Sequence, residues 1–175
     1  MSRNHTLSVL VSNNPGVLAR VAGLFSRRGF NIESLAVGPT ERPEVSRITL
    51  VATVEEDGAL EQLVKQLNKL IEVYKIVELD PTSVQRALIL VKVRSSQETR
   101  SAIIDTVTLF RGKAVDVSPD SITIEATGDT QKLDALITML EPFGIIELVK
   151  SGKVALDRGN KTITEAGKQS LRSAI

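Results

Sequence analysis

The chain has 175 residues, of which 42% are apolar and 25% are charged, and its formal net charge is +1. This composition is typical of a folded globular protein, and the near-neutral charge argues against partners such as nucleic acid or an anionic membrane. The absence of cysteine excludes disulfides, thiolate metal sites and thiol nucleophiles. No segment is long and apolar enough for a secretory signal or a membrane span, so we expect a cytoplasmic protein.

The first half of the chain predicts six elements in the order strand, helix, strand, strand, helix, strand. Compact apolar or alternating runs indicate the strands, and apolar residues at helical spacing, such as Val17, Val21 and Phe25, indicate the helices. The expected strands are 7–11, 30–37, 47–54 and 72–79, and the expected helices are 15–28 and 58–70.

The second half repeats this order with different residues. Its expected strands are 87–93, 114–117, 121–126 and 145–149, and its expected helices are 98–110 and 130–140. The order β-α-β-β-α-β is that of the ferredoxin-like fold. We therefore predict an α+β protein of two tandem ferredoxin-like βαββαβ domains, at residues 1–80 and 81–159, followed by a polar tail at 160–175.

Each predicted domain is small enough to be only marginally stable alone. The second strand of this fold lies at a sheet edge and exposes unpaired backbone groups. Pairing that edge with its copy in a second chain would satisfy those groups and bury more surface, so we expect a homodimer.

Residues that could support catalysis are scarce. His5 is the only histidine and stands in a segment expected to be frayed and solvated, so neither a histidine triad nor a histidine metal cluster can form within one chain. The phosphate-binding glycine motifs are absent. RNA binding is disfavoured because aromatic residues make up only 3% of the chain. We expect no catalytic residues, no metal site and no cofactor in this chain.

The turn at Asn13, Asn14, Pro15 and Gly16 is the most suggestive binding site. It precedes a helix, whose N-terminal amides and partial positive charge favour a carboxylate, and glycine allows close approach to the backbone. The asparagines offer donors and acceptors suited to an amino acid. The alternative is that this segment merely turns the chain and caps the helix.

A second candidate group opens the next strand. Asn31 adds another side-chain amide and Ile32 an apolar wall. Glu33 is the one acidic residue near the turn at Asn31, and we favour a structural role for it over a role in binding.

Several segments resemble one family closely. The residues that carry the resemblance are Leu7-Ser8-Val9-Leu10-Val11, Asn14-Pro15-Gly16-Val17-Leu18-Ala19-Arg20-Val21, the run from Leu24 to Leu35 with its Arg28-Gly29-Phe30-Asn31-Ile32-Glu33-Ser34-Leu35 segment, Ser46-Arg47, Lys65 to Leu70, Leu109-Phe110-Arg111, Asp116 to Pro119 and Lys132 to Ala135. They resemble the small, regulatory subunits of acetolactate synthase, also called acetohydroxyacid synthase, whose first domain is an ACT domain. The resemblance extends to about Gly159.

The resemblance implies a non-catalytic subunit that activates a separate catalytic chain and confers feedback inhibition by valine or a related branched-chain amino acid. Thiamine diphosphate, magnesium and FAD are then expected in the catalytic partner and not in this chain. The family binds its effector between two ACT domains. That assigns effector binding to Asn13, Gly16, Asn31 and Ile32, with Asn14, Pro15 and Val37 as neighbours. Ser12 stands where family members often carry an acid, which could alter affinity.

Two other functions stay open from the sequence. A free-standing amino-acid-responsive regulator would have the same paired domains but no enzyme partner. An enzyme in its own right is disfavoured by the missing histidine cluster, cysteine and phosphate loops.

Overall fold

The computed structural model describes residues 3–54 and 58–163. The chain forms two compact units. The first contains residues up to Val84 together with the segment that begins at Lys153, and the second runs from Gln85 to Gly152. Within the described ranges, no helix has the length and apolarity that a membrane crossing requires.

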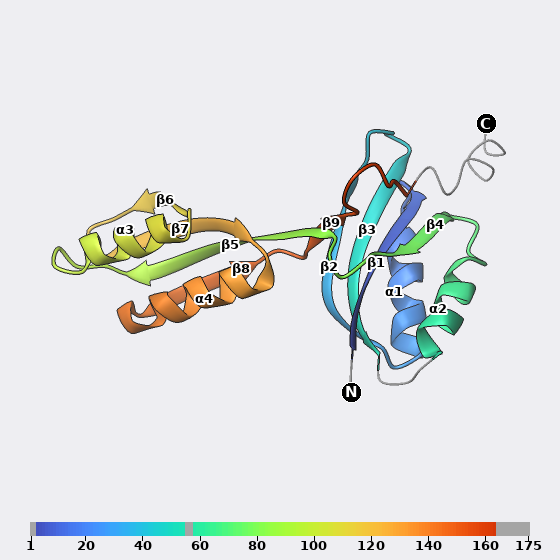
Figure 1. The fold of residues 1–175 in the computed structure, drawn as a ribbon, viewed down its shortest axis with the longest axis horizontal. Coiled ribbons are helices and arrows are strands. Elements are labelled where there is room, and N and C mark those ends of the chain that lie inside the picture. Colours follow the sequence, from blue (N-terminus) through green and yellow to red (C-terminus); the bar gives the residue numbers. More distant parts are fainter. Residues whose placement is uncertain (1–2, 55–57, 164–175) are drawn as a thin grey trace. The chain divides into compact units, whose positions relative to one another are not determined.

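The first unit is a four-stranded antiparallel sheet with two helices on one face (Figure 1). The elements are β1 (Arg3–Ser12), α1 (Val17–Arg27), β2 (Asn31–Pro39), β3 (Val45–Val54), α2 (Ala59–Leu67) and β4 (Val73–Glu78). The strands lie in the order β2-β3-β1-β4, which leaves β2 at one edge. Alternate residues of β1 and β3, such as Leu7, Val9 and Ile48, are fully buried under Val21 and Phe25 of α1.

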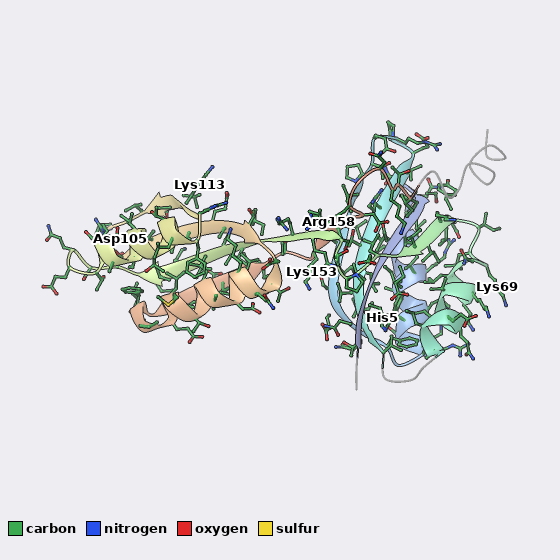
Figure 2. All side chains as sticks on the ribbon, viewed as in Figure 1. His5, Lys69, Asp105, Lys113, Lys153 and Arg158 are labelled. Atoms are coloured by element: carbon green, nitrogen blue, oxygen red, sulfur yellow. The ribbon has the colours of Figure 1, made fainter. Side chains whose placement is uncertain are left out.

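The opposite face of this sheet is covered by residues 153–163, here called the return segment. The backbone N–H of Lys153 donates to Ser34 Oγ at 2.8 Å, and Arg158 Nε donates to the Thr82 carbonyl at 2.6 Å; Figure 2 labels both of these return-segment residues. Ile163 is buried and packs with Leu10 and Val45. The return segment thus supplies the cover that helices supply on the other face.

Ser8 lies on this covered face, and its side-chain hydroxyl makes no hydrogen bond. Its side chain is fully buried, and no donor or acceptor among the described residues contacts Ser8 Oγ. Because a buried hydroxyl without a partner loses its hydration and gains nothing in return, Ser8→Ala should leave the free energy of unfolding unchanged or raise it by about 1 kcal/mol. Urea denaturation measures this, and a loss of more than about 1 kcal/mol would show that the hydroxyl is satisfied in solution.

The second unit has the same element order. Its elements are β5 (Val84–Arg94), α3 (Arg100–Leu109), β6 (Lys113–Val117), β7 (Ser121–Gly128), α4 (Thr130–Leu140), the short 3-10 helix η1 (Glu141–Phe143) and β8 (Ile145–Lys150). The strand order β6-β7-β5-β8 repeats that of the first unit. Its core is built from β5 and β7 residues, such as Ile89 and Ile124, against Ile103 of α3 and Leu136 of α4. The last strand, β9 (Val154–Leu156), belongs to the return segment.

The predicted α+β fold with two βαββαβ units is confirmed. The element ends differ, most of all at β1, which begins at Arg3 and not at Leu7. The polar residues Asn4 and Thr6 extend the strand because their backbones pair with Thr53 and Val51 of β3.

The limits of the units also differ from the predicted domain limits. Residues 153–159, assigned from the sequence to the second domain, group with the first unit because the return segment packs on its sheet. Of the polar tail at 160–175, Ile163 is buried in the first unit, and residues 164–175 lie outside the described residues.

Candidate functional site

The loop between β1 and α1 presents its backbone to solvent. Asn13, Asn14, Pro15 and Gly16 are all exposed. Gly16 is the N-cap residue of α1 and has φ +85°, a left-handed conformation that glycine adopts without steric cost. No side chain caps this end of the helix. The alternative function of the asparagines, capping α1, is therefore not what the structure shows, and the first-turn amides stay available to a ligand.

Hydrogen bonds instead hold the loop to the β2–β3 turn. The Asn13 backbone N–H donates to the Glu44 carbonyl at 2.9 Å, and Asn13 Nδ2 donates to the Pro43 carbonyl at 3.1 Å. Asn14 Nδ2 lies 3.4 Å from Ser12 Oγ. Asn13 is thus positioned by the turn while the backbone around Gly16 faces solvent.

A carboxylate lies in the same turn. Hydrogen bonds from the backbone N–H of Glu44 and from Arg42 lower the pKa of the Glu44 carboxyl group. Glu44 therefore carries its negative charge at neutral pH, and its oxygen Oε1 is 2.6 Å from Arg42 Nη2. This exposed ion pair lies within the turn that holds Asn13.

The start of β2 is the second predicted group. Asn31 is exposed, whereas Ile32 is partly buried and packs against the helix-side core. The pairing of β2 with β3 shifts register between Ile32 and Ser34, which marks a bulge at Glu33. The Glu33 carboxylate accepts from Asn4 Nδ2 at 2.7 Å and from Thr53 Oγ1 at 2.5 Å.

This three-residue network fixes the position of the strand start. The structural role that we predicted for Glu33 agrees with these hydrogen bonds. The sequence pointed to neither Asn4 nor Thr53, because nothing in the local pattern links three residues on three different strands.

A depression of about 440 Å³ opens beside the strand start. It is lined by Arg28, Gly29, Phe30, Asn31, Glu33, Thr53 and Ala59. A cavity of this volume is of the size that small-molecule sites have. Both a cationic and an anionic side chain reach it, a combination that suits a zwitterion.

One chain does not bring the two predicted groups together. Ser12, which precedes the loop, pairs with Val45 at the first residue of β3, whereas Asn31 pairs with Thr53 near its last. The two groups therefore lie at opposite ends of the sheet. Val37 lies between them on β2 and is 47% exposed.

His5 lies elsewhere than the sequence predicted. It is part of β1, is partly buried, and its Nδ1 is 2.5 Å from Glu78 Oε1, so the expectation of a frayed, solvated histidine was wrong. The pairing of β1 with β3 from Arg3 onward holds this end of the chain in the sheet. In the parts of the chain that the structure describes, no three histidine, aspartate or glutamate side chains gather as metal ligands.

Comparison with known families accounts for both units. The family described as an acetohydroxyacid synthase small-subunit-like ACT domain matches residues 7–75. The family described as the small subunit of acetolactate synthase matches residues 86–159.

Whole-chain relatives agree. The chain is 60% identical over 163 residues to the acetolactate synthase small subunit of Mycolicibacterium smegmatis, covering 93% of this chain and 95% of the relative. It is 54% identical over 157 residues to a probable acetolactate synthase small subunit of Archaeoglobus fulgidus, covering 90% and 98%. The crystal structure of the acetolactate synthase small subunit from Thermotoga maritima matches with a TM-score of 0.84 and 42% identity, covering 91% of this chain and 99% of that one. The chain therefore belongs to the acetolactate synthase small-subunit family, and its first unit is an ACT domain.

Proposed function

We propose that this chain is a non-catalytic regulatory subunit that activates the catalytic subunit of acetolactate synthase and makes it sensitive to valine or a related branched-chain amino acid. Its relatives are named as small subunits of that enzyme. The observation that carries the effector site is the uncapped N-terminus of α1 at Gly16, beside the anchored side chain of Asn13. The protein would act in the cytoplasm, and thiamine diphosphate, magnesium and FAD would belong to the catalytic partner.

The proposed effector site is shared by two chains. If the exposed β2 edges of two copies pair in antiparallel fashion, the partner's Asn31 comes to the end of the sheet where β2 of the first chain finishes at Pro39. That end also carries Pro43 and Glu44, the residues that hold Asn13. A homodimer therefore unites the two groups that a single chain keeps apart.

Each side chain has a distinct role in this site. The amides after Gly16 would bind the effector carboxylate with help from the helix dipole. Asn13 of one chain and the partner's Asn31 would bind the ammonium and carboxylate groups, and the partner's Ile32 would contact the aliphatic side chain. Asn14, Pro15 and Val37 would shape the surroundings. One methylene in such a pocket changes binding by only about 1–3 kcal/mol, so related amino acids would compete.

Inhibition requires that the effector bind two states of the assembled enzyme unequally. Typical coupling free energies of about 1–3 kcal/mol correspond to roughly 5- to 150-fold changes in affinity. A site between two chains suits this coupling, because any change in how the two ACT domains pack against each other then changes the affinity for the effector.

The first test is acetolactate formation by the cognate catalytic subunit, with and without this chain, across a valine titration. We expect the rate to rise when the chain is added and the rise to be reversed by valine, with leucine and isoleucine as comparison ligands. An unchanged rate, together with unchanged elution of the chain when the catalytic subunit is present, would contradict the proposal and favour a free-standing sensor.

A further inference from the structure

A depression of about 370 Å³ opens at one end of the sheet of the second unit. Its lining includes two apolar side chains, two of opposite charge and several hydroxyl groups, among them Phe143, Ile146, Arg94, Asp120, Ser96 and Ser121. All of these residues belong to the second unit, so one chain forms the whole depression. Its volume and its mixture of an apolar wall with a few polar groups are typical of small-molecule sites.

The loop beside this depression has the place in the second unit that the proposed effector loop has in the first. Residues 95–99 connect β5 to α3, as the proposed effector loop connects β1 to α1. The Ser95 backbone N–H donates to the Asp120 carbonyl at 2.9 Å, and the Asn13 N–H donates in the same way to the Glu44 carbonyl at 2.9 Å. The two units therefore share a backbone frame around these loops, but they place different side chains on it.

Arg94 supplies a cation to the depression. Gly144 has φ +90°, and a Cβ built there would lie 3.1 Å from Arg94 Cδ and 3.6 Å from Arg94 Nε. The Arg94 side chain thus lies against Gly144, where a larger residue would displace it. Within the described part of the chain its guanidinium group has no hydrogen-bond or ion-pair partner. The group can therefore bind a carboxylate, which arginine does with two parallel hydrogen bonds.

Asp120 supplies an anion to the same depression. Its Oδ1 accepts from Ser118 Oγ at 3.3 Å. Because an ionised carboxylate has about four acceptor positions, it can accept further hydrogen bonds. Among the described residues, Asp120 and Arg94 form no ion pair with each other although both line the depression. A ligand that carries both charges could contact both groups.

The apolar wall is fixed by two features of the chain after α4. Phe143 is partly buried and packs against the core of the second unit. The pairing of β5 with β8 shifts register between Lys92 and Val93, which leaves Ile146 as the extra residue of a bulge. Ile146 is 50% exposed and lines the depression. The wall suits a short aliphatic side chain.

The start of α3 is already capped by side chains. The Thr99 backbone N–H donates to Ser96 Oγ at 3.2 Å, and the Ser96 N–H donates to Thr99 Oγ1 at 2.9 Å. Recognition in this depression therefore depends on charged and apolar side chains and not on free helix amides.

We propose that the second unit has an amino-acid site of its own, in which Arg94 binds the carboxylate, Asp120 binds the ammonium group, and Phe143 and Ile146 contact a short aliphatic side chain. This site goes beyond the proposed function and does not depend on the homodimer, because one chain supplies all of its groups.

Amide NMR of the full chain during a titration with valine locates the binding. We expect the resonances of residues 94–99 and 120–121 to shift, and Arg94→Ala to raise the Kd measured there on the order of 10- to 100-fold. Arg86→Ala is the matched control in the same strand, since Arg86 is exposed and its Nη1 donates to the Gln85 carbonyl at 2.7 Å. It should change the Kd by less than about twofold. Shifts confined to residues 13–17 would support the proposed effector site and overturn this one.

Isovalerate separates the two charged contacts, because it is valine without the ammonium group. Asp120→Asn keeps the shape of the side chain and should weaken valine binding on the order of tenfold without weakening isovalerate binding. Arg94→Ala should weaken the binding of both ligands. Equal losses for both ligands in Asp120→Asn would overturn the ammonium contact, and an equal loss in Arg86→Ala and Arg94→Ala would overturn the carboxylate contact.

Discussion

Replacing Ile163 by aspartate is expected to lower the free energy of unfolding of the first unit by roughly 2–4 kcal/mol. Ile163 is 7% exposed and packs with Leu10 and Val45, with Tyr74 and Val77 beside them. The substitution removes apolar contacts and places a carboxylate in a buried apolar cluster, where burial disfavours its charged form. The first unit should therefore unfold before the second.

The measurement is calorimetry or urea denaturation combined with amide hydrogen exchange, which assigns the loss to one unit. Asn160→Asp is the matched control, since it adds the same charge at an exposed position of the return segment. Equal stability of the two variants would show that Ile163 does not hold the return segment in solution.

The position of Ile163 also ties the return segment to the proposed effector loop. Val45 pairs with Ser12 and follows Glu44, whose carbonyl accepts the backbone N–H of Asn13. Loosening the return segment should therefore disturb the turn that positions Asn13. A fragment ending at Thr82 lacks this cover, so poor folding of such a fragment would say nothing about where the effector binds.

The element order could be predicted from the sequence because both units bury one face of each helix. Val17, Val21 and Phe25 recur at helical spacing and are all buried against the sheet. The helix of the second unit at Thr130–Leu140 agrees with the prediction at both ends, and there Asp129 accepts a hydrogen bond from the Lys132 backbone as an N-cap. Periodicity and capping residues are local sequence signals, and here they were enough to locate these helices.

The return segment could not be predicted in this way. Its residues are mostly polar, and a single buried isoleucine gives no periodic pattern. Ile163 is buried because it packs with Leu10 and Val45 on the sheet face opposite the helices. The N-terminal extent of β1 could not be predicted for a similar reason. Asn4 and Thr6 belong to the strand because their backbones pair with β3, and their polar side chains give no sign of this pairing in the sequence.

The residues of the candidate site could be proposed from the sequence, but their positions relative to one another could not. Asparagine, glycine and a following helix identify the loop at 13–16 through its chemistry. That Asn31 lies at the far end of the sheet follows only from the antiparallel course of β2 and β3. The proposed effector site, which the family resemblance already implied to lie between two ACT domains, would therefore need a second chain to bring the loop and Asn31 together.

Gly16→Asp should abolish inhibition by valine while activation of the catalytic subunit persists. The added carboxylate would occupy the region where the proposed effector carboxylate meets the α1 amides, and like charges at such a site cost several kcal/mol, so the valine concentration for half inhibition should rise on the order of 100-fold or more. Activation without valine shows that the variant still folds and binds its partner.

Backbone strain must be separated from charge in this experiment. Gly16 has φ +85°, so any side chain there costs about 1 kcal/mol, yet a Cβ would meet no atom within 4 Å. Gly16→Ala therefore introduces the strain without the charge and should shift half inhibition by less than about tenfold. A large loss of valine sensitivity in the aspartate variant alone supports carboxylate binding at the α1 N-terminus. Equal losses in both variants would assign the effect to the loop conformation, and unchanged sensitivity in both would place the effector elsewhere.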